Sequence, residues 1–263
     1  MTLLQNKLLE MLIWLDSFLR KNQLVYYVDF GTLLGAARHK GFIPWDDDID
    51  ISMPRPDYEI LCKLLEKPVD HFVVESLSSG NPDYYYTYAK LYDIDTTMTE
   101  KNRYSLTRGV FIDIFPIDGI GHSLREALKG YRHFRRMNDF LMTRVCAYNK
   151  NRLFYKNIAI TVSRLIPDSF IATRKISIRI ERFLKKLNYN DCKYLLSSDF
   201  MFERDLTDDL CELQFEGINV FAPKRFDEYL TKCFGDWRKL PPVEDQKTTH
   251  TFSSVNLNKS FLK

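Results

Sequence analysis

The chain has 263 residues, of which 45% are hydrophobic and 28% charged, with only 10 Gly and 10 Pro. This composition is that of a globular protein with a substantial core, and it excludes a disordered, fibrous or peptide-sized chain. The formal net charge of +3 conceals an uneven distribution, because residues 124–188 hold 16 Lys and Arg against four Asp and Glu, a net charge of +12. The rest of the chain is therefore acidic.

The five cysteines are widely spaced, and none forms a Cys-x-x-Cys pair or stands near a His at metal-ligand spacing. We therefore expect neither a disulfide framework nor a structural zinc site, as is usual in a reducing compartment. No segment approaches the roughly 20 apolar residues that a membrane span needs. Lys7, Glu10 and Asp16 interrupt the apolar N-terminal positions where a signal peptide would need a continuous core. These features predict a cytoplasmic protein.

The first half of the chain alternates helical and strand patterns. Apolar residues every three or four positions predict an N-terminal amphipathic helix that begins at a Thr2–Gln5 capping box. The next segments predict, in chain order, a strand at 24–30, a helix to residue 40, a strand at 48–53, a helix at 57–66, and strands at 72–75, 84–92 and 110–115. This order predicts a mixed α/β catalytic core over residues 1–120.

The second half divides into two further parts. The basic region at 121–190 predicts helices, with breaks near 149–151 and at Pro167. The last part, 191–263, predicts a strand at 218–221 and a helix between Pro223 and Gly235, and we expect it to pack back on the core.

Acidic residues alternate with apolar ones at the strand predicted for 48–53. The side chains of Asp48 and Asp50 then share one face, about 7 Å apart, while Ile49 and Ile51 face the core. Two such carboxylates repel each other, and a divalent cation between them removes that repulsion. Oxygen ligands without thiols favour Mg²⁺ or Mn²⁺. An exposed acidic loop that continues Asp46 and Asp47 is the alternative.

A third carboxylate and a phosphate-binding turn complete the pattern. Asp113 stands inside a strongly apolar strand, where a metal would stabilise its charge, although an ion pair at a strand end is the alternative. Gly31 and Thr32 lie at a strand-to-helix turn, where backbone N–H groups and a hydroxyl can hold a phosphate. Together these groups indicate metal-assisted phosphoryl or nucleotidyl transfer.

Residues 31–59, GTLLGAARHKGFIPWDDDIDISMPRPDYE, resemble the signature of the LicD family, which includes the fukutin-type proteins and has a nucleotidyltransferase-like fold. GVFIDIFPIDG at 109–119, preceded by the strand around Lys90, and FGDWRKLPP at 234–242 match in the same order. The resemblance implies an α+β fold class, with a nucleotidyltransferase-like mixed β-sheet, flanking helices and an added basic helical region.

The resemblance also implies an activity. Members of the family transfer a phospho-alcohol group, typically phosphocholine or a phospho-polyol, from a CDP-activated donor to a hydroxyl of a cell-surface glycan or lipid-linked glycan precursor, with release of CMP. We expect CDP-choline as the donor, and lipopolysaccharide, teichoic acid or capsule as the kind of acceptor. By resemblance, Gly31 and Thr32 take the place of the phosphate-holding pair, Asp48 and Asp50 that of the metal-binding pair, and Asp113 that of a third carboxylate, which is also the expected base.

Four further residues are predicted to contact the donor. Arg38 and Lys90 are expected to bind phosphate, because Arg makes bidentate phosphate contacts and a Lys amid Tyr and Leu in a strand is unusual. Tyr85 and Tyr86, in a dense tyrosine cluster, are expected to contact choline through cation–π attraction. An ordinary strand with one buried face is the alternative for this cluster.

The basic residues at 124–188 are interleaved with apolar ones, as in amphipathic helices that rest on anionic lipid. No nucleic-acid-binding motif accompanies them, so we expect peripheral contact with the inner membrane face and no nucleic-acid partner. A solvated helix surface is the alternative.

Three other functions compete with the phosphotransferase. An Asp-x-Asp glycosyltransferase would need several βα units before its motif, and only about one predicted strand precedes Asp48. A nucleotidyltransferase would use the same metals but transfer the other half of the donor. The third is a membrane-docking scaffold without catalysis.

Overall fold

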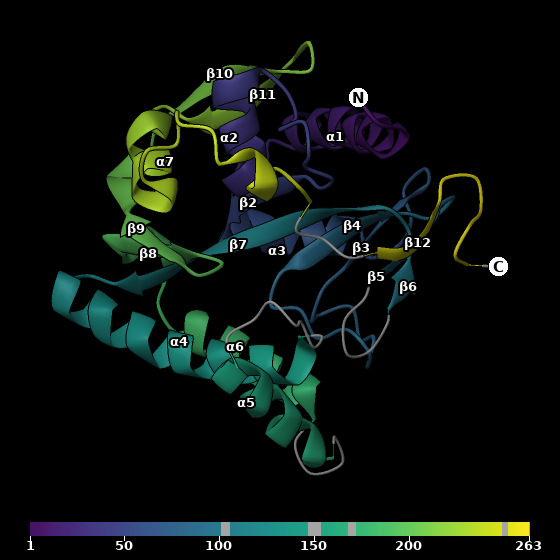
Figure 1. Ribbon diagram of the computed structural model, residues 1–263. Helices are drawn as coiled ribbons and strands as arrows, with labels where there is room; N and C mark the ends of the chain where they lie inside the picture. Colours follow the sequence, from purple (N-terminus) through teal and green to yellow (C-terminus); the bar gives the residue numbers. More distant parts are fainter. Residues whose placement is uncertain (101–105, 147–153, 168–171, 249–251, 263) are drawn as a thin grey trace.

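A mixed sheet of seven strands forms the centre of the protein, in a computed structural model that describes residues 1–100, 106–146, 154–167, 172–248 and 252–262 (Figure 1). Five strands lie in the order β1 (Tyr27–Val28), β2 (Asp50–Pro54), β7 (Phe111–Gly121), β4 (Ala89–Asp93) and β3 (Phe72–Glu75). The other two, β8 (Tyr194–Ser197) and β9 (Phe200–Glu203), extend the sheet beside the second half of β7. The expected α+β fold class with a mixed sheet is confirmed.

The long strand β7 organises this sheet because it pairs with three other strands. It runs parallel to β2 and antiparallel to β4 and β8, and all its residues are buried. It also continues past Pro116, where the sequence predicted its end. Pairing with β4 ends at Ile114 and pairing with β8 begins at Ile117, so the missing N–H of Pro116 faces the gap between them and disrupts no ladder bond.

Other strands are shorter than their sequence patterns predicted. The strand expected at 24–30 is confined to β1, because the Asp29 side chain accepts a hydrogen bond from the Phe30 N–H and begins a helix there. The strand expected at 84–92 begins only at Ala89, and the tyrosine-rich residues before it form a loop. The strand expected at 48–53 begins at Asp50, so Asp48 precedes it.

Helices lie above and below the sheet in the view of Figure 1, with α1, α2 and α7 above it and α4, α5 and α6 below it. The α-helices of the described residues are α1 (Leu3–Lys21), α2 (Phe30–His39), α3 (Arg55–Leu64), α4 (Leu124–Val145), α5 (Phe154–Leu165), α6 (Thr173–Leu184) and α7 (Phe226–Phe234). The Thr2–Gln5 capping box that begins α1 is confirmed by both of its hydrogen bonds. Among the helices that the structure describes, none is long and apolar enough to cross a membrane.

The basic region forms helices as expected, and these have a core of their own. Apolar residues of α4 and α6 pack against the end of β7 and against β8, and they include Ala127, Phe134, Leu141, Ile180 and Leu184. The expected break at Pro167 is confirmed because α5 ends at Leu165, whereas the break expected at 149–151 lies outside the described residues.

Two buried arginines hold this region together and attach it to the sheet. Arg144 of α4 donates to the Ser163 and Ile166 carbonyl oxygens at the end of α5, at 2.6 and 2.7 Å. Arg55 of α3 makes a bidentate contact with Asp118 of β7, at 2.7 and 2.5 Å, and lies 3.7 Å from Glu181 of α6. Part of the positive charge therefore serves internal contacts.

The C-terminal part supplies β8 and β9 to the central sheet, and it also forms smaller elements. The expected strand at 218–221 is confirmed within a hairpin of β10 (Leu210–Phe215) and β11 (Ile218–Pro223), and the expected helix is α7. A separate sheet, which the sequence did not predict, contains β12 (Phe252–Asn256), β5 (Thr97–Glu100) and β6 (Thr107–Arg108). Short 3₁₀ helices lie at Tyr189–Asp191, Arg204–Leu206 and Val243–Asp245. The division into three parts at 120 and 190 stays a prediction.

The buried carboxylate of Asp29 connects four of these elements. Its Oδ1 accepts the Phe30 N–H at the start of α2, at 2.7 Å. Its Oδ2 accepts the Ser52 hydroxyl of β2 at 2.5 Å, the Tyr229 hydroxyl of α7 at 3.1 Å and the Ser197 hydroxyl of β8 at 3.4 Å. Burial raises the pKa of Asp29, while these hydrogen bonds oppose the shift.

Replacement of Asp29 is expected to destabilise the protein by more than the loss of a helix cap. Asp29→Ala leaves buried hydroxyl groups unpaired, so we expect a loss of about 2–4 kcal/mol in the free energy of unfolding, measured by urea denaturation. Asp29→Asn retains an acceptor and should cost less. Ser123→Ala, which removes only the exposed cap of α4, should cost about 1 kcal/mol. Equal losses in the free energy of unfolding for Asp29→Ala and Ser123→Ala would contradict a stabilising role for the Asp29 hydrogen bonds.

Candidate active site

A cavity of about 490 Å³ lies between the sheet and α4. Its lining comes from the start of α2, from β2 and β7, from the loop before β4, from α4 and from the turn between β8 and β9. Asp48, Asp50 and Asp113 all belong to this lining, so the structure brings together the three carboxylates that the sequence singled out.

Strand register explains why two of these carboxylates meet. Asp50 and Asp113 are direct partners in the parallel pair of β2 and β7, and Asp113 is in turn the partner of Lys90 in the antiparallel pair of β7 and β4. The three charged residues therefore form a row across neighbouring strands. Asp48 stands two residues before Asp50, ahead of the strand rather than in it.

The electrostatics of the row favour a bound cation. Burial of the carboxyl group, followed by the charges of Asp48 and Asp113, raises the pKa of Asp50 well above its usual range. A divalent cation would offset these effects, and an all-oxygen donor set fits Mg²⁺ or Mn²⁺. Oxygen atoms of Asp46, Asp47 and Asp48 also lie within 4.8 Å of one another. Residues 46–48 thus offer more possible metal-binding oxygen atoms than the sequence predicted, because only Asp48 among them was expected to bind a metal.

Lys90 lies behind Asp113 and does not line the cavity. Its side chain is 1% exposed, and Nζ is 2.8 Å from Asp113 Oδ1, 3.3 Å from Glu100 Oε1 and 3.3 Å from the centre of the Phe111 ring. Burial lowers the pKa of Lys90, but the charges of Asp113 and Glu100 outweigh it and the net shift is upward. Lys90 therefore holds Asp113 in place, and its contact with phosphate stays a prediction.

Gly31 and Thr32 occupy the first turn of α2, next to the carboxylates. The Thr32 hydroxyl accepts a hydrogen bond from the Asp50 N–H at 2.8 Å and is buried. A Cβ at residue 31 would lie 2.8 Å from Asp46 Oδ2, so glycine lets that carboxylate approach the helix. The structure thus assigns both residues a part in positioning the acidic segment, while phosphate binding stays a prediction. Phe30, just before them, has a φ of +42° and lines the cavity.

The other predicted donor contacts lie outside the cavity lining. Arg38 is at the far end of α2, where it donates to the Trp237 carbonyl oxygen at 2.9 Å. It thereby joins two of the sequence blocks that carried the family resemblance. Tyr85 is buried in the core of the basic region, and the Tyr86 hydroxyl donates to Glu100 at 3.1 Å. A role in substrate binding stays a prediction for all three residues.

Four aromatic side chains line the cavity, and none of them is among the donor contacts predicted from the sequence: Phe30, Tyr88, Phe115 and Phe134. The Phe115 ring lies 4.6 Å from the Tyr88 ring and 5.3 Å from the Phe30 ring. The wall that α4 provides was not predicted either, and it consists of Arg135, Asn138, Asp139 and Met142. A signal for this wall existed, because spacings of three and four residues place Arg135, Asn138 and Met142 on one helix face.

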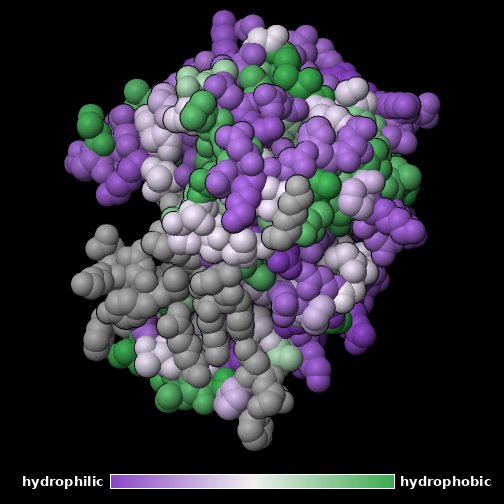
Figure 2. All heavy atoms as spheres, turned by 90° about the vertical axis from the view of Figure 1, so that its right-hand side faces the viewer, coloured by the Kyte–Doolittle hydropathy of each residue, from purple (hydrophilic) through white to green (hydrophobic). Residues whose placement is uncertain are grey.

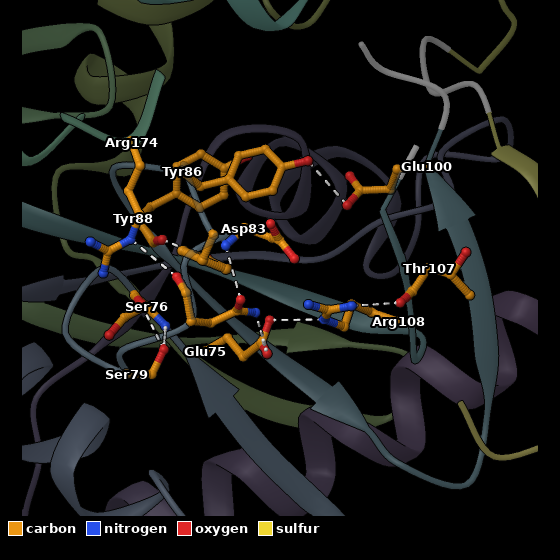
Figure 3. A network of polar contacts seen from close by, with 12 residues as sticks. Glu75, Ser76, Ser79, Asp83, Tyr86, Tyr88, Glu100, Thr107, Arg108 and Arg174 are labelled. Carbon is orange, nitrogen blue, oxygen red and sulfur yellow. Dashed lines mark hydrogen bonds and ion pairs between the residues drawn. The ribbon is translucent and has the colours of Figure 1, made fainter. Parts of the chain in front are cut away.

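A polar network holds the loop between β3 and β4, and this loop contains the cavity-lining residue Tyr88 (Figure 3). Arg174 of α6 donates to the Leu77 and Asn81 carbonyl oxygens at 2.8 and 3.0 Å. The Asn81 side-chain amide in turn donates a hydrogen bond to the Glu75 carboxylate at 3.0 Å. The same carboxylate accepts a second hydrogen bond, from Arg108, also at 3.0 Å. The basic region thus positions part of the cavity wall from outside.

The fold and the carboxylate row are compatible with a nucleotidyltransferase-like fold, and comparisons with known proteins agree. Residues 23–140 match the family described as LicD/FKTN/FKRP, nucleotidyltransferase domain. The chain is 29% identical over 252 residues to the lipopolysaccharide cholinephosphotransferase LicD of Haemophilus influenzae, with 92% of each chain covered. It is also 34% identical over 106 residues to an uncharacterized protein of Rickettsia prowazekii, covering 37% of this chain and 36% of that one. Residues 23–140 therefore match a LicD-type nucleotidyltransferase domain, and the resemblance found in the motifs is confirmed.

Neutralisation of Asp50 is expected to stabilise the protein in the absence of a metal and to abolish its stabilisation by a metal. Because its pKa is raised, the ionised carboxylate is unfavourable in the folded state. In chelator-treated buffer at pH 7, Asp50→Asn should therefore raise the melting temperature, by about 2–4 °C for each kcal/mol of relief. Added Mg²⁺ should raise the melting temperature of the unsubstituted protein and leave that of the variant unchanged. Equal Mg²⁺ responses in calorimetry would contradict this metal site.

Proposed function

We propose that the protein is a metal-dependent phosphotransferase that moves phosphocholine from CDP-choline to a hydroxyl of a cell-surface glycan or its lipid-linked precursor. The observation that carries the proposal is the convergence of Asp48, Asp50 and Asp113 on one cavity within a LicD-type domain. The identity of 29% to a lipopolysaccharide cholinephosphotransferase, over nearly the whole chain, supports this substrate class.

The three carboxylates are the residues that would hold Mg²⁺ or Mn²⁺. When bound, such a cation neutralises the charge that develops on the phosphate oxygens of the leaving group. Thr32 fixes the backbone at Asp50 through the 2.8 Å hydrogen bond, and Lys90 fixes Asp113 Oδ1 at 2.8 Å. These contacts keep the carboxylates oriented before the substrates arrive, which reduces the reorganisation that the reaction requires.

The proposed reaction is a single displacement at the distal phosphorus of the donor. The acceptor hydroxyl oxygen forms a bond to that phosphorus, and the bond to the bridging oxygen breaks with its electron pair retained by CMP. The proton of the hydroxyl passes to the Asp113 carboxylate, which lines the cavity and acts as the base.

The aromatic lining supports choline as the alcohol. A quaternary ammonium group is attracted to aromatic faces through cation–π interaction, and four aromatic side chains line this cavity. The rings of Tyr88 and Phe30 both lie against Phe115, so three of the four aromatic side chains form one cluster in the lining. CDP-glycerol or CDP-ribitol would gain no such attraction.

Turnover is expected with CDP-choline, Mg²⁺ and a lipopolysaccharide acceptor, with CMP as the nucleotide product identified by mass spectrometry. Asp113→Asn should lower kcat by about 10²–10⁴-fold because it removes the base. Asp209→Asn, which removes an exposed carboxylate outside the cavity lining, should have no effect. Pyrophosphate as the product would instead indicate a nucleotidyltransferase, and release of UDP or UMP from UDP-sugars a glycosyltransferase.

We also propose that the outer face of α4 contacts the inner face of the membrane, where lipid-linked acceptors would be reached. Four exposed cations recur along about 16 Å of this face, at Arg125, Lys129, Arg132 and Arg136. Within the described residues none of them makes an ion pair. Figure 2 shows hydrophobic side chains at the lower end of the molecule, where the basic helices lie, and Ile158, Val162 and Leu165 of α5 are exposed. This combination suits an anionic lipid surface.

Binding to vesicles is expected to require anionic lipid and the cations of α4. The protein should sediment with vesicles that contain phosphatidylglycerol, and not with phosphatidylcholine vesicles, because each cation near the surface contributes about 1 kcal/mol. Replacement of all four cations by Gln should weaken this binding at least ten-fold. A control with the same change in net charge replaces exposed lysines elsewhere, namely Lys21, Lys67, Lys224 and Lys239. Equal binding by the two variants would argue against this docking face.

A further inference from the structure

The cavity has one cationic side chain in its lining, and the basic region supplies it. Among the described residues around the cavity, Arg135 of α4 is the only Lys or Arg, while Asp48, Asp50 and Asp113 stand on the side formed by the sheet. Its neighbours in the lining include Asn138 on the same helix and Ser198 in the β8–β9 turn, both of which have neutral hydrogen-bond donors. The same side also carries Asp139 and Asp199, so within the described part of the chain Arg135 is the one positive group in an otherwise acidic lining.

The guanidinium of Arg135 is held by weak partners. Its Nη1 lies 2.7 Å from Asp199 Oδ2 and its Nη2 lies 3.5 Å from Asp139 Oδ1. All three side chains are well exposed, at 37%, 57% and 65% respectively. Exposed ion pairs of this kind contribute about 0–1 kcal/mol, so exchange of the carboxylate for a better partner costs little.

The position of Asp199 does not depend on Arg135 alone. Tyr131 of α4 donates its hydroxyl hydrogen to the Asp199 carbonyl oxygen at 2.9 Å, one turn before Arg135 on the helix. The β8–β9 turn would therefore keep a contact with α4 when the guanidinium moves away from the Asp199 carboxylate. Arg135 can change its partner without loss of this wall.

A nucleoside diphosphate is the partner that fits. Its phosphates bring two or more negative charges into a cavity whose sheet side is already acidic, and a bound cation there can meet only part of that charge. A guanidinium offers paired N–H donors in a planar fork that matches two phosphate oxygens. Arg135 is in the lining, whereas Arg38 and Lys90, which the sequence favoured for this task, are not.

We propose that Arg135 binds the diphosphate of the donor from the α4 side of the cavity, and that Asp199 holds the guanidinium in place until the donor arrives. The proposal rests on the proposed function, because it takes the donor to be a CDP-alcohol. It adds a substrate-binding role for the basic region, which then forms part of the active site as well as an outer surface.

The test compares two substitutions that break the same ion pair from opposite ends. Arg135→Gln should raise the KM for CDP-choline and the Kd for CDP, measured by calorimetry with Mg²⁺, by about ten-fold or more, since a charged hydrogen bond is lost. Arg135→Lys should give an intermediate increase. Asp199→Asn should leave both constants unchanged or lower them, because it removes the competing carboxylate. If Arg135 only holds the turn, both substitutions would raise the constants alike, and that result would overturn the proposal.

A matched control and a separate binding readout keep the outcomes distinct. Arg225→Gln breaks another short, exposed ion pair, 2.6 Å from Asp205, outside the cavity lining, and should change neither constant. Melting curves verify that each variant is folded. If the unsubstituted protein turned over no CDP-alcohol, the proposed function would fail, while the CDP titrations would still test Arg135. If turnover were normal and Arg135→Gln bound CDP as tightly as Arg225→Gln, only the present inference would fail.

Discussion

The buried carboxylate of Asp29 is the interaction on which the arrangement of the site depends. It accepts hydrogen bonds from α2, β2, β8 and α7, and two of these elements lie far from Asp29 in the sequence. Because Asp29 both ends β1 and begins α2, it fixes the first turn of α2 beside β2. Thr32 in that turn then holds the Asp50 backbone, so the buried Asp29 contributes through α2 to the placement of Asp50.

The register of two parallel strands brings carboxylates close together, and their repulsion is unfavourable in the folded protein. Asp50 and Asp113 face each other across β2 and β7, and the raised pKa of Asp50 reflects the cost of keeping these groups together. Lys90 offsets part of this charge from beneath, while Asp46 to Asp48 add to it. A bound cation would relieve this unfavourable electrostatic energy.

The basic region explains why the protein as a whole is nearly neutral. Helix α4 has three faces with different tasks. One packs on α6 and β7, a second lines the cavity through Arg135 and Asn138, and a third exposes cations to solvent. The positive charge is therefore divided among internal contacts such as Arg144, the cavity lining and an outer surface, and it offsets the net negative charge of the segments before and after the basic region.

Much of this could be predicted from the sequence, because the features concerned are local. The capping box at Thr2, the helical periodicity of α1 and α4, the strand around Asp113 and the motif that contains Asp48 and Asp50 all depend on residues close together in the chain. Other features arise only when distant segments pack. The sequence could not show that β7 continues through Pro116, that Tyr85 and Arg38 lie outside the cavity lining, or that α4 forms one wall of the cavity. Each of these depends on pairing or packing between elements separated by tens of residues, and local propensity carries no information about such contacts.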